Sequence, residues 1–286
     1  FNEETPDWLS FFMFTYFTDR DGKMQLEALA QSGFDPLSRT CRFMLTEEAH
    51  HMFVGETGVS RTIQRTCEAM NEAGISDPYE TDRIRALGVI DLPTIQKKLN
   101  LHYSLSLDLF GSEVSTNASN AFTAGIKGRY QEVKIDDDHR LLNDTYPVLK
   151  MVDGKAEVVD MPALSAINMR LRDDYTKDAA GGVGRWNKVI EKAGIAFEMK
   201  LPNVAFHRQI GEFAPVEATP EGEILSTEAW QAGRDQWLPS TADGDFIASL
   251  MKPEWEAGRY AGWIAPPRVG IDGKPGDFEY VQLYNA

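Results

Sequence analysis

Apolar and polar residues alternate over the first 75 residues in a pattern that predicts two long helices. Asp7 is a suitable N-cap for a helix over residues 8–32, whose first ten residues are apolar on nearly every side and are therefore expected to be deeply buried. Residues 33–36 (Gly-Phe-Asp-Pro) break this helix, and a second one is predicted over residues 37–73, ended by Gly74. Because the break is short, the two helices are expected to pack as antiparallel neighbours.

The middle of the chain predicts two more helices separated by polar turns. A third helix should begin after the cap-like Asp91 and extend from residue 92 to about residue 122. Polar turns are predicted for 127–160, and a fourth helix for 163–192. Its Gly181-Gly182-Val183-Gly184 run indicates a kink or an interruption.

The sequence pattern no longer predicts long helices beyond residue 194. Residues 197–201 and 204–207 read as short strands, and 220–286, rich in glycine, proline and tryptophan, as a mostly irregular region. We therefore expect a mainly α protein with two parts: a helical bundle over 1–193, and an irregular, short-stranded C-terminal extension over 194–286 that packs on it.

Composition narrows the class of protein. The 286 residues include 29 basic and 44 acidic side chains, for a net charge of −15, which opposes binding to nucleic acid or to anionic lipid. No uncharged apolar run approaches the roughly 18 residues that a membrane span needs. Cys41 and Cys67 are separated by about 39 Å of helical rise, so they cannot pair. We expect reduced, buried thiols in a cytoplasmic protein.

Glu48 and His51 form a Glu-x-x-His pair in the second predicted helix. Three helical residues turn through roughly 300°, so both side chains leave one face and can reach one ion. In an antiparallel hairpin, the numbers of residues level with each other sum to about 70 here, which sets Asp19 beside His51 and Gly22 beside Glu48. Asp21 lies about 200° further round its helix than Asp19, so it ranks second as a ligand.

A lone Glu-x-x-His is more often a salt-bridged surface pair than a metal site. The interpretation as a metal site gains from Asp19 on the adjoining helix, because three ionisable groups in an apolar layer are costly unless a cation offsets them. Carboxylate with imidazole suits non-haem iron. Glu47 and His50 point about 100° away and are expected to be supporting or surface groups. The apolar layer is expected from neighbouring side chains, namely Phe43, Met44, Leu45, Met52 and Phe53.

Other candidate motifs are weaker. Asp136 and His139 lie among turn residues and favour a solvated acidic loop, and residues 19–23 lack the glycine and the ligand spacing of a calcium loop. His102 and His207 are expected to be structural, and neither cysteine has the context of a nucleophile. The glycines near residue 182 do not follow a strand, which argues against a phosphate-binding loop.

Basic residues gather in the middle third of this acidic chain. Ordinary salt bridging on a helix surface is the simpler interpretation, and a site for the phosphates of a carrier such as coenzyme A is the sharper one. The residues concerned are Lys127, Arg129, Arg170, Arg172, Lys177, Arg185 and Lys188.

Motifs spread over the whole chain resemble those of one protein family. They are Thr-Pro-Asp-Trp-Leu-Ser-Phe-Phe-Met-Phe at 5–14, Thr-Asp-Arg-Asp-Gly-Lys at 18–23 and Leu-Thr-Glu-Glu-Ala-His-His at 45–51, with 89–94, 170–174, 261–265 and 278–281. Each motif alone is unspecific, and the combination is specific. By these motifs the sequence is similar to the oxygenase components of benzoyl-CoA 2,3-epoxidases, within the ferritin-like di-iron acyl-CoA epoxidase family.

The resemblance implies a ferritin-like bundle with a di-iron centre that inserts one atom of O2 into the ring of benzoyl-CoA, in the catabolism of aromatic compounds. It also implies a separate reductase that carries FAD and iron–sulfur clusters and takes electrons from NADPH. Matched by motif, the iron ligands in this sequence are Asp19, Glu48 and His51.

One part of the family pattern is missing. A site of this kind needs a further carboxylate and a second Glu-x-x-His from two other helices, but outside the second helix the residues three before His102, His139 and His207 are leucine, aspartate and valine. In the family these ligands lie upstream of the segment that matches Phe1, so the chain is expected to be the C-terminal part of a longer protein and to hold half a site. Alone, it should bind iron weakly, if at all, and not turn over.

Three alternatives stay open. The chain could belong to a phenylacetyl-CoA epoxidase, which shares the bundle and the carrier. It could be a non-catalytic ferritin-like protein that stores iron or serves a structural role. It could also be a truncated subunit that completes its site only with a partner.

Overall fold

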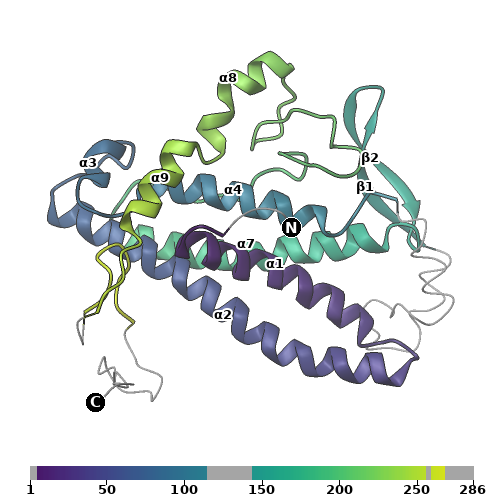
Figure 1. The fold of residues 1–286 in the computed structure, drawn as a ribbon. Coiled ribbons are helices and arrows are strands. Elements are labelled where there is room, and N and C mark those ends of the chain that lie inside the picture. The colour runs from purple at the N-terminus through teal and green to yellow at the C-terminus, as the bar shows by residue number, and fades with distance from the viewer. Residues whose placement is uncertain (1–4, 115–143, 256–258, 268–286) are drawn as a thin grey trace.

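Four long helices form the body of the molecule (Figure 1). The structure is a computed structural model that describes residues 5–114, 144–255 and 259–267. Within these residues α1 packs against α2, α4 and α7, and α2 also packs against α7. The helices are α1 (Trp8–Leu29), α2 (Asp35–Glu72), α4 (Leu92–Asp108) and α7 (Ile167–Lys192). The expected mainly α class is confirmed.

The hairpin of α1 and α2 forms as its sequence predicts. The Asp7 carboxylate caps α1 by accepting from the Ser10 backbone N–H at 2.7 Å. Pro36 occupies the first turn of α2, where its missing N–H costs nothing. The five residues between the helices reverse the chain, so α1 and α2 run antiparallel over much of their length (Figure 1).

Aromatic side chains fill the space between these helices. Tyr16 and Phe17 of α1, Tyr103 of α4, and Tyr175 and Trp186 of α7 are all fully buried in one continuous apolar core. Burying such large rings is the main source of stability expected for a bundle of this size.

The predicted third helix is too long. α4 ends at Asp108, and Gly111 then adopts a φ of +82°, a conformation that glycine reaches without strain. Residues 115–122 of the prediction lie outside the described part of the chain.

A β-hairpin occupies part of the region predicted to be polar turns. Strands β1 (Thr145–Val152) and β2 (Lys155–Pro162) pair antiparallel from Thr145 opposite Pro162 to Val152 opposite Lys155. Asp153 and Gly154 join them, with φ angles of +49° and +79°. An Asp-Gly pair is the turn that a two-residue hairpin favours, so the signal was present in the sequence.

Other expectations for the second half were also wrong. α7 runs through its glycines without interruption, and residues 197–201 and 204–207 form no strand. The C-terminal region holds two helices, α8 (Thr227–Trp237) and α9 (Thr241–Leu250), besides the short α3 (Thr81–Arg85) earlier in the chain. Ser240 and Asp243 form a reciprocal capping box at the start of α9, a start signal that the Gly- and Pro-rich composition obscured.

The last described segment returns to the bundle. Arg61 of α2 donates to the Ala265 carbonyl at 2.6 Å, and Ala265 donates back to the Arg61 carbonyl at 3.1 Å. Within the described residues, no helix combines the length and the apolar content needed to cross a membrane.

Candidate metal centre

Asp19 of α1 meets Glu48 and His51 of α2, as the register of the hairpin predicts. His51 Nδ1 lies 3.6 Å from Asp19 Oδ2 and 3.7 Å from Glu48 Oε2. One ligand atom from each residue lies within 4.8 Å of the others, and no second group of this kind exists among the described residues. Ligand atoms about 2.1 Å from one transition metal ion stand roughly 3–4 Å apart, so this spacing suits a single cation.

Two glycines of α2 bring the helices close enough for this meeting. A Cβ atom added to Gly55 would lie 2.5 Å from the Tyr16 backbone nitrogen and 2.7 Å from the Phe12 carbonyl oxygen. One added to Gly58 would overlap the Phe12 ring. Gly55 is one turn beyond His51. The closest approach of the two backbones therefore lies directly beside the three candidate ligands.

Electrostatics at the three residues favour a bound cation. Burial, together with the negative charge of Glu48, raises the pKa of Asp19 to about 6, and the nearby His51 offsets part of the increase. Glu48 Oε2 is buried and has no hydrogen-bond partner. A carboxylate oxygen left without a donor is costly, and a metal ion would satisfy it. Two carboxylates and an imidazole are also a donor set that non-haem iron accepts, so the residues present fit part of an iron site.

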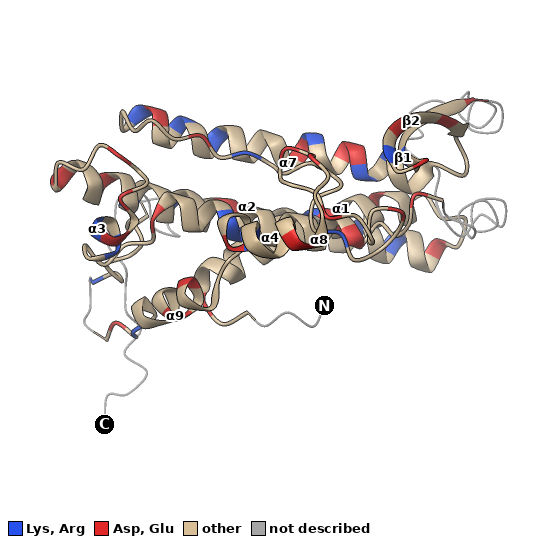
Figure 2. Ribbon diagram, turned by 90° about the horizontal axis from the view of Figure 1, so that it is seen from above, with Lys and Arg blue, Asp and Glu red and all other residues tan. Residues whose placement is uncertain are grey.

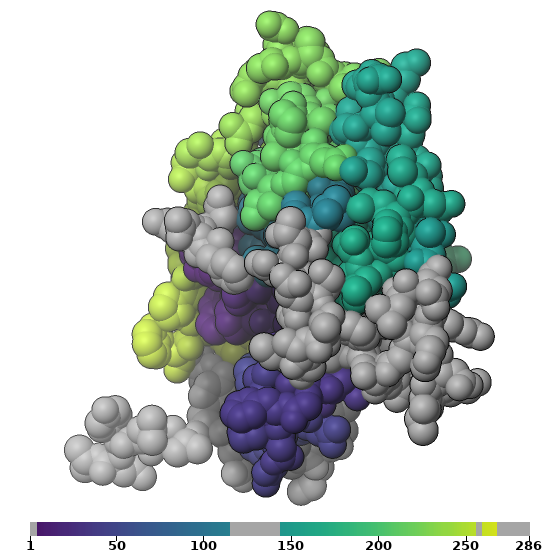
Figure 3. Space-filling model, turned by 90° about the vertical axis from the view of Figure 1, so that its right-hand side faces the viewer, coloured from purple at the N-terminus to yellow at the C-terminus, as the bar shows by residue number. Residues whose placement is uncertain are grey.

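The apolar layer expected around the site is not closed. The side chains of Asp19 and Glu48 are 18% and 17% exposed, but that of His51 is 49% exposed. Nearby, Phe43 is 73% and Phe53 66% exposed. The expectation was wrong because the α1–α2 hairpin presents these rings on its outer surface. Figure 3 views the molecule from the side where the turn of this hairpin protrudes.

The start of α1 departs from its prediction in the same way. Trp8, Phe11 and Phe14 are exposed, although the apolar sequence predicted deep burial for the whole segment. Glu47 and His50 are exposed and stand outside the metal group, as expected. Asp21 also stands outside it: burial raises its pKa to about 7, and its side chain faces the protein interior.

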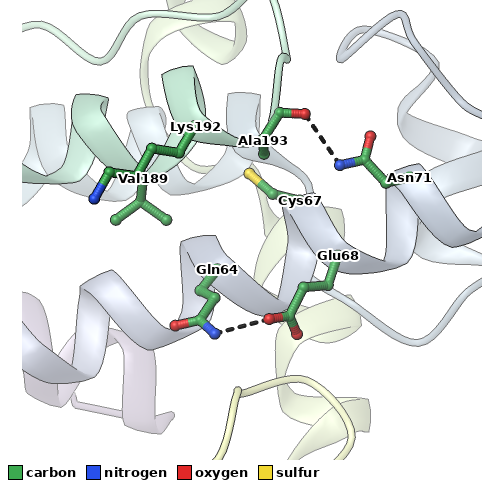
Figure 4. Close-up of a pocket in the computed structure, with 7 residues that line it drawn as sticks. All are labelled: Gln64, Cys67, Glu68, Asn71, Val189, Lys192 and Ala193. Carbon is green, nitrogen blue, oxygen red and sulfur yellow. Dashed lines mark hydrogen bonds between the residues drawn. The ribbon is translucent and has the colours of Figure 1, made fainter. Parts of the chain in front are cut away.

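The cysteines and His102 show no sign of catalysis. Cys41 and Cys67 are buried free thiols on α2, as predicted. Cys67 borders a groove of about 280 Å³ between α2 and α7 (Figure 4), and burial raises its pKa to about 12, so it stays a thiol. Burial and the charge of Lys98 lower the pKa of His102 to about 4, which keeps this buried imidazole neutral.

The basic residues of α7 do not converge on one point. Lys and Arg alternate with Asp and Glu along this helix (Figure 2). Arg172 is buried against Glu113 at 3.3 Å, Lys177 lies 3.7 Å from Asp174, and Arg185 pairs with Glu56. These contacts favour the interpretation as salt bridges. Lys127, Arg129, the Asp136 and His139 motif and residues 278–281 lie outside the described part of the chain.

The structure adds residues that sequence reasoning missed. Gly55 and Gly58 show a recognisable signal, because glycine three apart inside a long helix is unfavourable without a packing reason. The contact between Tyr16 and Gly182 gave no such signal, since it joins helices more than 160 residues apart in sequence.

Comparison with known proteins supplies the context for this site. No family model matches the chain. Over 283 residues, 99% of its length, the chain is 54% identical to the "Benzoyl-CoA oxygenase component B" of Aromatoleum evansii. It spans 59% of the length of that relative. The resemblance to benzoyl-CoA oxygenases noted in the sequence is thereby confirmed: the chain is similar to benzoyl-CoA oxygenase component B over nearly its whole length.

Proposed function

We propose that this chain is part of an oxygenase component that epoxidises the aromatic ring of benzoyl-CoA at a non-haem iron centre. The meeting of Asp19, Glu48 and His51 carries the proposal, because two carboxylates and an imidazole converge where the homologous sequence leads one to expect a redox metal. The name of the relative supports benzoyl-CoA as the substrate and a multi-component system.

The three ligands amount to half of a di-iron site. Bundles of this type hold two irons with a carboxylate from each of two helices and a Glu-x-x-His from each of two others. The described residues supply a single such half. We therefore propose that the other half comes from residues outside this chain, which would cover the exposed apolar side chains of α2 before and after His51, including Phe43 and Phe53. The matched relative is long enough to contain them.

Each residue of the half-site has a definable task. Asp19 and Glu48 supply negative charge that offsets the cation, and their low exposure restricts competition from water. His51 presents Nδ1 to the site and leaves its other ring nitrogen free for an orienting partner. Iron held there would supply the O2 chemistry. We propose that its electrons come from NADPH through a separate reductase with FAD and iron–sulfur clusters.

We keep the two-part organisation as a proposal. Residues 1–193 would carry the metal half-site, and 194–286 would serve as an extension packed on the helices. The contact of Arg61 with Ala265 supports such packing for the last described segment.

Metal analysis tests the function. The isolated chain should retain well under one iron per molecule after gel filtration, because three ligands hold iron weakly. Co-expression with the region of the relative that this chain does not match should raise iron to two per complex. The complex should then consume O2 with benzoyl-CoA and reductase, and much less with phenylacetyl-CoA.

Three outcomes would contradict the proposal. Two tightly held irons in the isolated chain would refute the half-site. Preference for phenylacetyl-CoA would identify the other acyl group. Iron uptake into a large shell without acyl-CoA-dependent O2 consumption would indicate a storage protein.

A further inference from the structure

We propose that α7 positions the candidate metal ligands: residues 178–186 set the rotation of α1 and the register of α2, so that Asp19 meets Glu48 and His51. The inference rests on the proposed metal function and assigns positioning roles to Asp178 and Gly182. Asp178 pairs with Arg20 and Lys23, and Gly182 faces Tyr16, so both residues would act on the site through α1.

Tyr16 of α1 is seated in a notch of α7. Its hydroxyl donates to the Ala179 carbonyl at 2.8 Å. A Cβ atom added to Gly182 would overlap that hydroxyl, so only glycine leaves room for it. Tyr16 precedes Asp19 by three residues, or nearly one turn, so any displacement of the tyrosine moves the aspartate.

Asp178 of α7 holds the part of α1 that follows Asp19 in sequence, whereas Tyr16 precedes Asp19. Its carboxylate accepts from Arg20 Nε at 3.2 Å and from Lys23 Nζ at 3.3 Å. The Arg20 guanidinium also lies 4.1 Å from the centre of the Tyr16 ring. Arg20 leaves the helix about 100° round from Asp19. Holding Arg20 on α7 therefore directs Asp19 towards α2.

The next turn of α7 holds α2. Trp186 donates from its indole N–H to the Glu56 carbonyl at 3.1 Å, and Arg185 forms a two-pronged pair with the Glu56 carboxylate. The Trp186 ring also packs on Tyr16, with 4.7 Å between ring centres. Glu56 lies five residues after His51. One stretch of α7 thus contacts both ligand-bearing helices within about one turn of the site.

The geometric tolerance shows why such positioning matters. A functional ligand must stand within about 0.5 Å of its productive place. The Asp19 carboxylate extends roughly 5 Å from the axis of α1, so a rotation of about 5° exhausts that tolerance. The α1–α2 glycine contact fixes the separation of the two helices, whereas contacts from α7 on a different side of α1 resist its rotation.

Gly182→Ala and Asp178→Asn test the proposal in the full 286-residue chain. Binding of Mn²⁺ is measured from the paramagnetic broadening of NMR signals near His51, which detects dissociation constants up to the millimolar range. We expect Gly182→Ala, which changes no charge, to weaken Mn²⁺ binding at least tenfold, and Asp178→Asn to weaken it severalfold. Asp178→Glu should restore most of the affinity.

Two matched controls separate positioning from general destabilisation. Tyr103→Phe removes the hydrogen bond between Tyr103 and Thr176 of α7, 2.9 Å long, and keeps the ring that packs on Phe17 of α1. Gly184→Ala adds a methyl group to an exposed position of α7 with nothing within 4 Å. Both should bind Mn²⁺ within twofold of the parent chain. Circular dichroism checks that each variant is folded. If Gly182→Ala does not fold, the proposal is tested by the loss of Mn²⁺ affinity in Asp178→Asn and its recovery in Asp178→Glu.

Different failures have different meanings. The inference would be overturned if a folded Gly182→Ala bound Mn²⁺ as well as the parent chain. If Gly182→Ala does not fold, parent-like Mn²⁺ binding by Asp178→Asn would overturn it. Neither result would contradict the metal site. Equal weakening in Tyr103→Phe would also overturn it, because affinity would then follow stability alone. If the parent chain binds no Mn²⁺ at millimolar concentration and Asp19→Asn leaves its spectra unchanged, the metal proposal fails and the inference fails with it.

Discussion

Asp19→Asn should stabilise the metal-free chain at neutral pH, although it removes a candidate ligand. The folded protein holds Asp19 with a pKa of about 6, raised by burial and by the charge of Glu48. An aspartate in the unfolded chain titrates near about 3.9. The folded state therefore binds this proton more tightly than the unfolded state. The stability associated with the protonated form is fully present below about pH 4 and is lost as pH rises through about 6.

The size of the effect follows from the shift. Two pH units correspond to about 3 kcal/mol, and relaxation of the site in the charged state reduces what replacement recovers. Asparagine has the same shape and no charge, so it avoids the penalty at any pH. We expect the variant to gain about 1–3 kcal/mol in free energy of unfolding at pH 7.5, and close to nothing at pH 4, where the parent residue is protonated as well.

Urea unfolding at both pH values, with chelator present, measures this difference. Glu47→Gln is the matched control: it removes an exposed carboxylate of the neighbouring helix and should change stability by less than about 0.5 kcal/mol. A loss of stability in Asp19→Asn at pH 7.5, or the same gain at both pH values, would refute the electrostatic argument. Selection for binding a cation explains why a destabilising carboxylate would be kept at this position.

Three further predictions concern the same site. Gly55→Ala should lower the free energy of unfolding by about 2–4 kcal/mol in denaturant titrations, because the new methyl group meets backbone atoms of α1 that cannot move easily. In the control, Gly22→Ala, the methyl group meets nothing nearer than 3.6 Å, and the free energy of unfolding should rise by up to about 1 kcal/mol. Mn²⁺ affinity in the parent chain should fall as pH drops below about 6, because protons compete for Asp19; an affinity that is flat from pH 7.5 to 5 would argue against Asp19 as a ligand. His51→Ala should abolish Mn²⁺ binding in the NMR titration while changing unfolding by less than about 1 kcal/mol, since the imidazole is half exposed; retained binding would remove His51 from the site.

The exposed rings of the hairpin bear on how the site is completed. Phe43 and Trp8 lie on an outer surface, whereas aromatic residues at comparable positions of α4 and α7, such as Tyr103 and Trp186, are fully buried. Large exposed apolar side chains near functional groups commonly mark an interface. The surface that the half-site leaves open thus has the character expected of one that another protein segment covers.

The sequence by itself determined the α1–α2 hairpin and the meeting of the three candidate ligands. Both follow from local rules: Asp7 caps the first helix, the break near residue 34 is too short for anything except an antiparallel return, and helical periodicity then sets Asp19 level with His51. Local sequence signals also specify the β-hairpin at Asp153-Gly154 and the capping box of α9. Both were missed because composition was given more weight than turn and cap signals.

Tertiary structure alone decided how open the site is and what holds it in register. An apolar stripe such as the one through Trp8 and Phe11 is the same in sequence whether it faces a core or solvent. The contact of Tyr16 with Ala179 and Gly182 requires residues at least 163 positions apart in sequence to meet in space. Periodicity specifies which side of a helix is apolar, but burial depends on whether another element packs there, and that is settled only when the whole chain has folded.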